Sequence, residues 1–93
     1  MFLPEKPVGE KVSLAGAVTL DRIPLAGTCR VGSVVAQGAL RKRLMEMGFV
    51  PGALVEVVRV APLGDPIEYK IKGYHLSLRA AEAKLISVVP EGV

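Results

Sequence analysis

Apolar and polar residues alternate over short segments of this chain, a pattern that predicts β-strands rather than long helices. The clearest case is 67–72, where Ile67, Tyr69 and Ile71 point to one face and charged residues point to the other. Three further segments are rich in β-branched residues or alternate in the same way, and we expect strands there: 28–36, 75–79 and 85–89.

The alternation changes phase inside the segment 53–61. Val55 and Val57 share one face, whereas Val58 and Val60 share the other. A phase change within a strand predicts a bulge or a strong bend, which small barrels use to curve their sheets. The Pro- and Gly-rich residues that follow predict a hairpin loop at 62–66.

The strongest helix pattern lies between Gly38 and Gly48. Leu40, Leu44 and Met47 recur at the i, i+4, i+7 spacing, so we expect them on one face against the core. Gly48 is expected to end the helix, because a residue without Cβ enters the left-handed conformation at little cost. Pro51 and Gly52 follow it and favour a sharp turn.

Two shorter segments predict single helical turns. The first is 19–24, with Thr19 as its N-cap, and the second is 80–84. For residues 12–18 the sequence leaves two alternatives open, an edge strand or an irregular arm. The short strands, with one helix inserted after the first main strand, predict a mainly β fold that forms a small barrel or sandwich.

The length of 93 residues predicts a single domain. We place this domain at 13–89, with a flexible N-terminal tail at 1–12 and a short C-terminal tail at 90–93. The first residues lack the pattern of a signal peptide, and no apolar run approaches the length of a membrane span. A cytoplasmic location without direct membrane insertion is therefore expected.

The net charge is modest, at +3 from twelve basic and nine acidic residues. The tightest basic group, 41–43, is typical of the solvated face of a helix. Nucleic-acid binding through this group would be strongly salt-sensitive, but a chain with two Phe, two Tyr and no Trp offers few stacking side chains. We therefore expect no nucleic-acid partner.

Catalysis is not expected from the residues present. No Gly-Lys pair occurs, which excludes a P-loop. The single cysteine, Cys29, and the single histidine, His75, fall on different predicted strands, without a third orienting residue. A lone cysteine also excludes an internal disulfide and fits a reducing compartment.

Cys29 and His75 are the only candidate metal ligands among cysteines and histidines, and they are weak ones. The sequence has no Cys-x-x-Cys or His-x-x-His pairing, so a site would need both residues and a carboxylate to meet in space. The patterns instead favour a buried Cys29 and a solvent-facing His75. A metal bridge between two molecules through His75 is an equal alternative.

Four motifs, in this order and spacing, resemble the FeoA family. They are Leu40-Arg-Lys-Arg-Leu-Met-Glu-Met-Gly-Phe-Val-Pro-Gly52, then Val55-Glu-Val-Val, the loop Ala61-Pro-Leu-Gly-Asp-Pro66, and the ending Gly73-Tyr-His-Leu-Ser-Leu-Arg79 with Glu82-Ala83. The resemblance runs from about Ser13 to Val89. It implies an SH3-like barrel of about five short strands with one short α-helix inserted after the first main strand.

The resemblance also implies a role. It predicts a non-enzymatic cytoplasmic accessory protein of bacterial ferrous iron uptake, whose partner is a membrane iron transporter with a cytoplasmic G-protein domain. The alternative is a stand-alone metal- or ligand-sensing module related to the C-terminal domain of metal-dependent repressors, with Fe²⁺ or Zn²⁺ as the ion. The resemblance leaves open whether the chain forms a homo-oligomer.

We expect the partner surface among exposed apolar, aromatic and arginine side chains, which are enriched in interfaces. Five residues meet this description near the predicted helix and turns: Arg41, Arg43, Met45, Leu63 and Tyr74. The alternative is that Met45 and Leu63 fold back on their own domain, since single exposed apolar residues are common.

Overall fold

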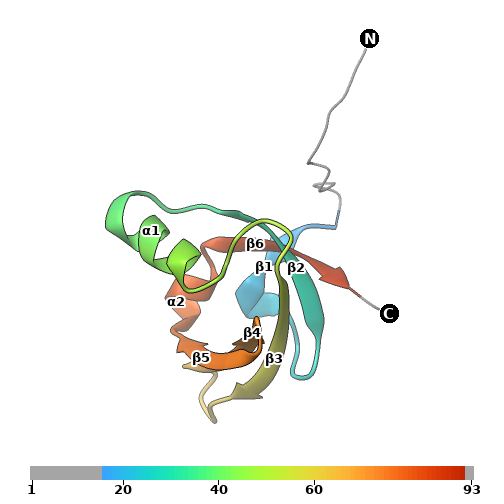
Figure 1. The fold of residues 1–93 in the computed structure, drawn as a ribbon. Coiled ribbons are helices and arrows are strands. Elements are labelled where there is room, and N and C mark those ends of the chain that lie inside the picture. Colours follow the sequence, from blue (N-terminus) through green and yellow to red (C-terminus); the bar gives the residue numbers. More distant parts are fainter. Residues whose placement is uncertain (1–15, 92–93) are drawn as a thin grey trace.

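The computed structural model describes residues 16–91, which form six strands and three short helices (Figure 1). The elements in chain order are β1 (Val18–Thr19), the 3₁₀-helix η2 (Leu20–Arg22), β2 (Thr28–Val34), α1 (Gly38–Glu46), β3 (Leu54–Val60), β4 (Ile67–Ile71), β5 (Tyr74–Leu78), α2 (Ala80–Ala83) and β6 (Ile86–Glu91). This confirms the mainly β fold with one helix after the first main strand. The sixth strand is the two-residue β1, which is too short to produce an alternating pattern.

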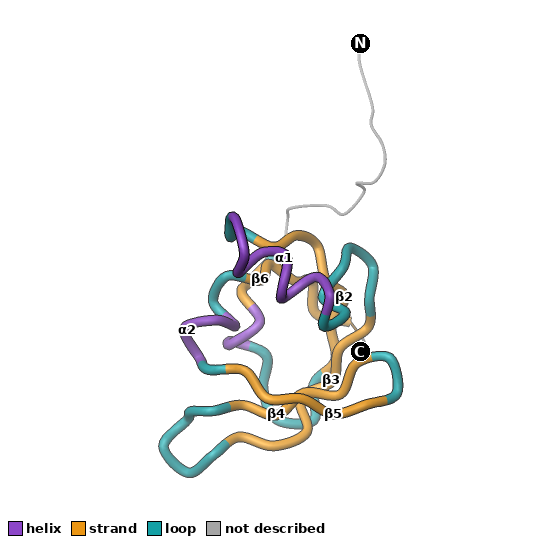
Figure 2. The backbone as a smooth tube through the Cα atoms, turned by 60° about the vertical axis from the view of Figure 1, so that its left-hand side comes forward, coloured by secondary structure: helices purple, strands orange, loops and turns teal. Residues whose placement is uncertain are grey.

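The strands form one antiparallel sheet in the order β1-β6-β2-β3-β4-β5. The sheet curls strongly, and α1 lies across one end of it (Figures 1 and 2). Strands β1 and β5 are its edges and do not pair with each other, so the barrel is not closed by strands. The short helix α2 contacts both β5 and η2, and it helps to fill the interval between the two edges.

The core inside the curled sheet is mostly aliphatic. Its two largest side chains are Phe49 and Tyr69, whose rings meet edge to face at a centroid distance of 6.5 Å. Leu44 of α1 is fully buried there, and Leu40 and Met47 pack against the core from partly buried positions. The predicted apolar face of the helix is therefore confirmed.

The predicted bulge in the second long strand is also confirmed. The register between β3 and β4 shifts between Val57 and Arg59, where the apolar alternation changes phase. A second shift lies between Val31 and Ser33 on β2. Bulges bend a strand and increase its twist, which accounts for the curl of so small a sheet.

Helix α1 ends as its sequence predicts. Gly48 follows the C-cap residue Met47 and has φ of +115°, a conformation that favours glycine. A Cβ at this position would lie 3.3 Å from the hydroxyl of Tyr74 and 3.4 Å from Ile71. Conformation and close packing both require glycine here.

Four local details differ from the sequence predictions. Thr19 precedes η2, but its hydroxyl donates a hydrogen bond to the side chain of Asp21 and makes no cap bond. Strand β2 ends at Val34, two residues before Ala36, and Tyr74 is the first residue of β5 rather than part of the turn.

The fourth difference is that β6 continues through Pro90 to Glu91, where a strand end at Val89 and a tail from 90 were expected. Since β1 pairs only with Ser87 and Val88, Pro90 lies where β6 has a single neighbour, and a strand tolerates proline there.

The predictions for the tail at 1–12 and for residues 12–15 lie outside the described residues. Of the open alternatives for 12–18, the structure shows a strand only at Val18. Between residues 16 and 91, no helix is long and apolar enough to span a membrane.

Candidate functional site

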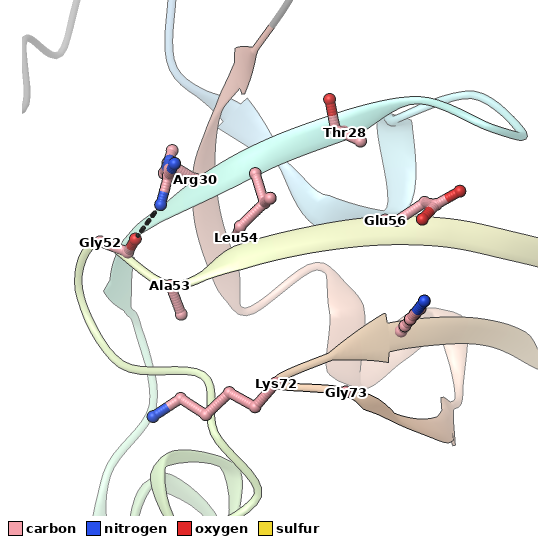
Figure 3. A pocket seen from close by; sticks show the side chains of 9 residues that line it. Thr28, Arg30, Gly52, Ala53, Leu54, Glu56, Lys72 and Gly73 are labelled. Atoms are coloured by element: carbon pink, nitrogen blue, oxygen red, sulfur yellow. Dashed lines mark hydrogen bonds between the residues drawn. The ribbon is translucent and has the colours of Figure 1, made fainter.

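A hollow of about 460 Å³ lies on the outer face of the sheet, across β2, β3 and β4 (Figure 3). We call it the strand hollow. The residues that line it are Thr28, Arg30, Gly52, Ala53, Leu54, Glu56, Lys70, Lys72 and Gly73. It lies over inner strands of the sheet and the adjoining turns, so that side chains and the backbone of two glycines line it.

The hollow exists because small residues lie between large ones. Gly52 and Ala53 lead from the turn after α1 into β3, and Gly73 follows Lys72 in the turn between β4 and β5. No atom lies within 4 Å of where a Cβ of Gly52 or Gly73 would stand. Leu54 rises among these small residues with 46% of its surface exposed.

The charges around the strand hollow are predominantly positive. Arg30 is held on one side, since its Nε lies 2.7 Å from a carboxylate oxygen of Glu91 and its guanidinium donates to the carbonyl of Gly52 at 3.0 Å. Lys70 and Lys72 are exposed and make no ion pair with the described residues. Glu56 is the one carboxylate in the lining.

Two of the five residues predicted for a partner surface line one hollow on α1. Arg41 and Met45 line a shallow hollow of about 400 Å³ along the outer side of this helix. We call the residues of this hollow the α1 surface: Gly38, Arg41, Lys42, Met45 and Glu46. Arg41 is also anchored, because its guanidinium donates to the carbonyl of Val34 at 3.0 Å. Met45 is half-buried and packs against the core, so it folds back on its own domain in part.

Two more of the predicted residues are engaged within the domain. Arg43 forms an ion pair with Glu82, which ties α1 to α2. Tyr74 is 44% exposed, and its hydroxyl donates to the carbonyl of Met47 at the end of α1. Both contacts join elements that are distant in the chain.

Leu63 lies apart from the other predicted partner residues. It is 96% exposed in the loop between β3 and β4, so it does not fold back on the domain. The residues after α1 lead into the start of β3, whereas this loop follows the end of β3, roughly 20 Å away along the strand (Figure 1). One compact surface therefore does not contain all five residues.

The two weak metal-ligand candidates are not brought together. Cys29 is fully buried on β2, and burial, with the charge of Glu91, raises its pKa to about 12. His75 is exposed on β5, where its Nδ1 lies 2.8 Å from a carboxylate oxygen of Glu68. Strands β3 and β4 separate them, about 14 Å along the sheet. Within residues 16–91 no three His, Cys, Asp or Glu side chains cluster in a way that could hold a metal ion.

The strand hollow could not be predicted from the sequence. Arg30, Leu54 and Lys72 are far apart in the chain, and only the pairing of β2, β3 and β4 brings them together. One local feature does indicate it. Val55 and Val57 face inward, so the side chain of Leu54 must lie on the outer face of β3.

The match to known families covers the described fold. Residues 18–90 match the model of the FeoA domain. The chain belongs to the FeoA domain family. A FeoA-like protein from Clostridium acetobutylicum has the same fold, with a TM-score of 0.77 and 33% identity over 84% of this chain and 91% of that one.

Two further FeoA relatives bear on function. A crystal structure of FeoA from Stenotrophomonas maltophilia, described as an SH3 domain protein complexed with zinc, has a TM-score of 0.67 and 36% identity over 80% of this chain and 89% of that one. This likeness confirms the SH3-like fold. A fusion protein of Porphyromonas gingivalis, named Fe(2+) transport protein A/Fe(2+) transporter FeoB, is 49% identical over 55 residues, which are 59% of this chain. This FeoA chain matches only 6% of the length of that relative.

The fold of this chain also resembles part of a longer protein. IdeR of T. acidophilum has a TM-score of 0.71 and 18% identity over 95% of this chain and 37% of that one. At this identity the likeness shows a shared fold alone.

Proposed function

We propose that this chain is a non-enzymatic cytoplasmic accessory protein of bacterial ferrous iron uptake, which binds the cytoplasmic G-protein portion of a membrane iron transporter. The observation that supports this most directly is the P. gingivalis protein, in which a segment 49% identical to this chain is part of one polypeptide named for both transport protein A and transporter FeoB. Two domains joined in one chain are held at a high effective concentration, which suits partners that work together.

The chemistry of the described residues supports a binding role. The thiol of Cys29 is buried with its pKa raised to about 12, so it is a poor nucleophile at neutral pH. The surface, by contrast, presents two hollows with exposed apolar and cationic side chains. We propose the α1 surface, with Tyr74 beside it, as a contact with the transporter, and Leu63 as a separate contact at the other end of the barrel.

A pull-down with the purified G-protein portion of the transporter tests this proposal. We expect capture whose extent depends on whether GDP, a non-hydrolysable GTP analogue or no nucleotide is bound. Arg41→Glu should weaken it and Lys84→Glu, an equal charge change on an exposed residue outside α1, should not. Absence of binding in all three nucleotide states would refute the function.

A second candidate function, a stand-alone metal-sensing module, is supported by the zinc complex of the S. maltophilia relative. In that role His75 and Glu68 would bind Fe²⁺ or Zn²⁺ together with ligands from a second copy. Titration of Zn²⁺ into the chain, followed by amide spectra and light scattering, tests this. Metal-dependent dimers that His75→Ala abolishes would support it, and unchanged spectra and mass would exclude it.

A further inference from the structure

We propose that the strand hollow binds an extended, acidic polypeptide segment that places one apolar side chain against Leu54. This assigns a second binding surface and a class of ligand, and it does not depend on the identity of the transporter. Three features of the hollow lead to it: its charge, its apolar centre and the backbone of Lys72.

The positive charge of the hollow favours an anionic ligand. The lining holds three cations, Arg30, Lys70 and Lys72, and the carboxylate of Glu56. Because Glu91 pairs with Arg30, Lys70 and Lys72 are the cations left to face a ligand. Three other arginines among the described residues, Arg43, Arg59 and Arg79, each lie within ion-pair distance of a carboxylate of the domain. Within residues 16–91, Lys70 and Lys72 have no such partner, and their ammonium groups can pair with acidic side chains of a ligand.

The exposed leucine at the centre of the hollow also favours an apolar contact. Leu54 lies opposite Arg30 in the pairing of β2 with β3, and β4 runs along its other side (Figure 3). An exposed leucine between cations favours a ligand with an apolar side chain flanked by acids. An extended segment repeats its side chains on one face every two residues, about 6.6 Å apart, which suits the two-residue separation of Lys70 and Lys72.

The backbone of Lys72 is the third feature. Lys72 and Gly73 form the two-residue turn between β4 and β5, with φ of +52° and +84°. Such turns favour Asn-Gly, whereas lysine in this conformation is strained. A strained residue beside a binding surface is typical of a position that is kept for function.

The hollow favours a polypeptide over a nucleic acid or a small anion. No aromatic ring lines the hollow for base stacking, and a small anion would leave the exposed Leu54 uncovered. The hydroxyl of Thr28 and the carboxylate of Glu56 are instead suited to accept hydrogen bonds from the backbone N–H groups of an extended segment.

The test is a titration of the isotope-labelled chain with a short peptide that carries one leucine flanked by glutamates and serines. We expect amide shifts concentrated at Arg30, Leu54 and Lys72, and an affinity that falls with added salt. The same peptide with lysines in place of glutamates should not bind, and the peptide with serine in place of leucine should bind more weakly.

Matched variants locate the binding. The double variant K70E/K72E should weaken binding on the order of tenfold, because its charges repel the ligand. K42E/K84E, which makes the same charge change on two exposed lysines elsewhere, should bind like the wild type. L54S should weaken binding, whereas V35S, at a valine that is 67% exposed, should not.

Three results would overturn the inference: equal binding of the lysine peptide, shifts centred away from the hollow, or equal losses in K70E/K72E and K42E/K84E. A positive peptide titration together with a negative pull-down would leave the hollow established and refute the proposed transporter partner. The reverse combination would refute the hollow alone.

Discussion

The hydroxyl of Tyr74 donates a hydrogen bond to the backbone carbonyl of Met47, which joins the start of β5 to the end of α1. The last carbonyls of a helix have no partner within the helix, and this phenol satisfies one of them. Tyr74→Phe should therefore lower the free energy of unfolding by about 1 kcal/mol, or about 4–8 °C in melting temperature. Thermal unfolding followed by circular dichroism measures it, and an unchanged melting temperature would show that the bond contributes nothing.

Tyr69 offers a matched substitution with the opposite expectation. Its ring is fully buried, and its hydroxyl has no hydrogen-bond partner among the described residues. Burial, and to a smaller extent the electrostatic effect of Asp21 and Cys29, raises the pKa of Tyr69, so the hydroxyl stays neutral. Tyr69→Phe removes an unsatisfied polar group, and we expect stability to stay equal or to rise by about 1 kcal/mol. A clear loss of stability in the same melting experiment would contradict this.

Glu82 should make the stability depend on pH in the acid range. The backbone N–H of Arg79 and the guanidinium of Arg43 hydrogen-bond its carboxylate and lower its pKa below the usual value. A carboxyl whose pKa is lower in the folded state stabilises the fold above its unfolded pKa, and this contribution is lost as the pH falls through the folded pKa. Glu82→Gln should flatten the acid limb of a stability-against-pH curve.

The control for Glu82 is Glu46→Gln. Glu46 is exposed on α1 and makes no ion pair with the described residues, so its substitution should leave the acid limb unchanged. Equal flattening by both variants would mean that general charge, rather than the contacts of Glu82, sets the pH dependence.

Cys29 should be unreactive in the native protein. Burial removes the thiol from solvent and, with the charge of Glu91, raises its pKa to about 12, so very little thiolate forms near neutral pH. We expect a disulfide reagent such as DTNB to label it slowly in buffer and at once in denaturant. Rapid labelling of the folded chain would show that β2 opens locally.

Substitution of Lys72 should change stability and peptide affinity in opposite directions. Lys72→Asn suits the positive φ of the turn better and should stabilise the domain by about 0.5–1 kcal/mol. The same change removes a cation from the strand hollow, so affinity for the acidic peptide should fall. Chemical unfolding and peptide titration on one variant measure both effects, and a fall in stability would refute the assignment of strain.

Local features of this fold could be predicted from the sequence because their causes are local. The stop of α1 at Gly48 and the shift in register after Val57 are both visible in a few neighbouring residues. The pair between Arg43 and Glu82 could not be predicted, since its members lie 39 positions apart in the chain. The separation of Leu63 from the candidate residues of α1 could not be predicted either, because only the path of β3 shows that they lie at opposite ends of this strand.

The position of β6 in the sheet affects how the domain folds during synthesis. β6 is the last strand in the chain, yet it lies between the first two, β1 and β2, and pairs with both of them. During synthesis the sheet cannot be completed until residue 91 has left the ribosome, and until then β2 presents an open edge to chaperones and to other nascent chains. Such long-range pairing also slows folding.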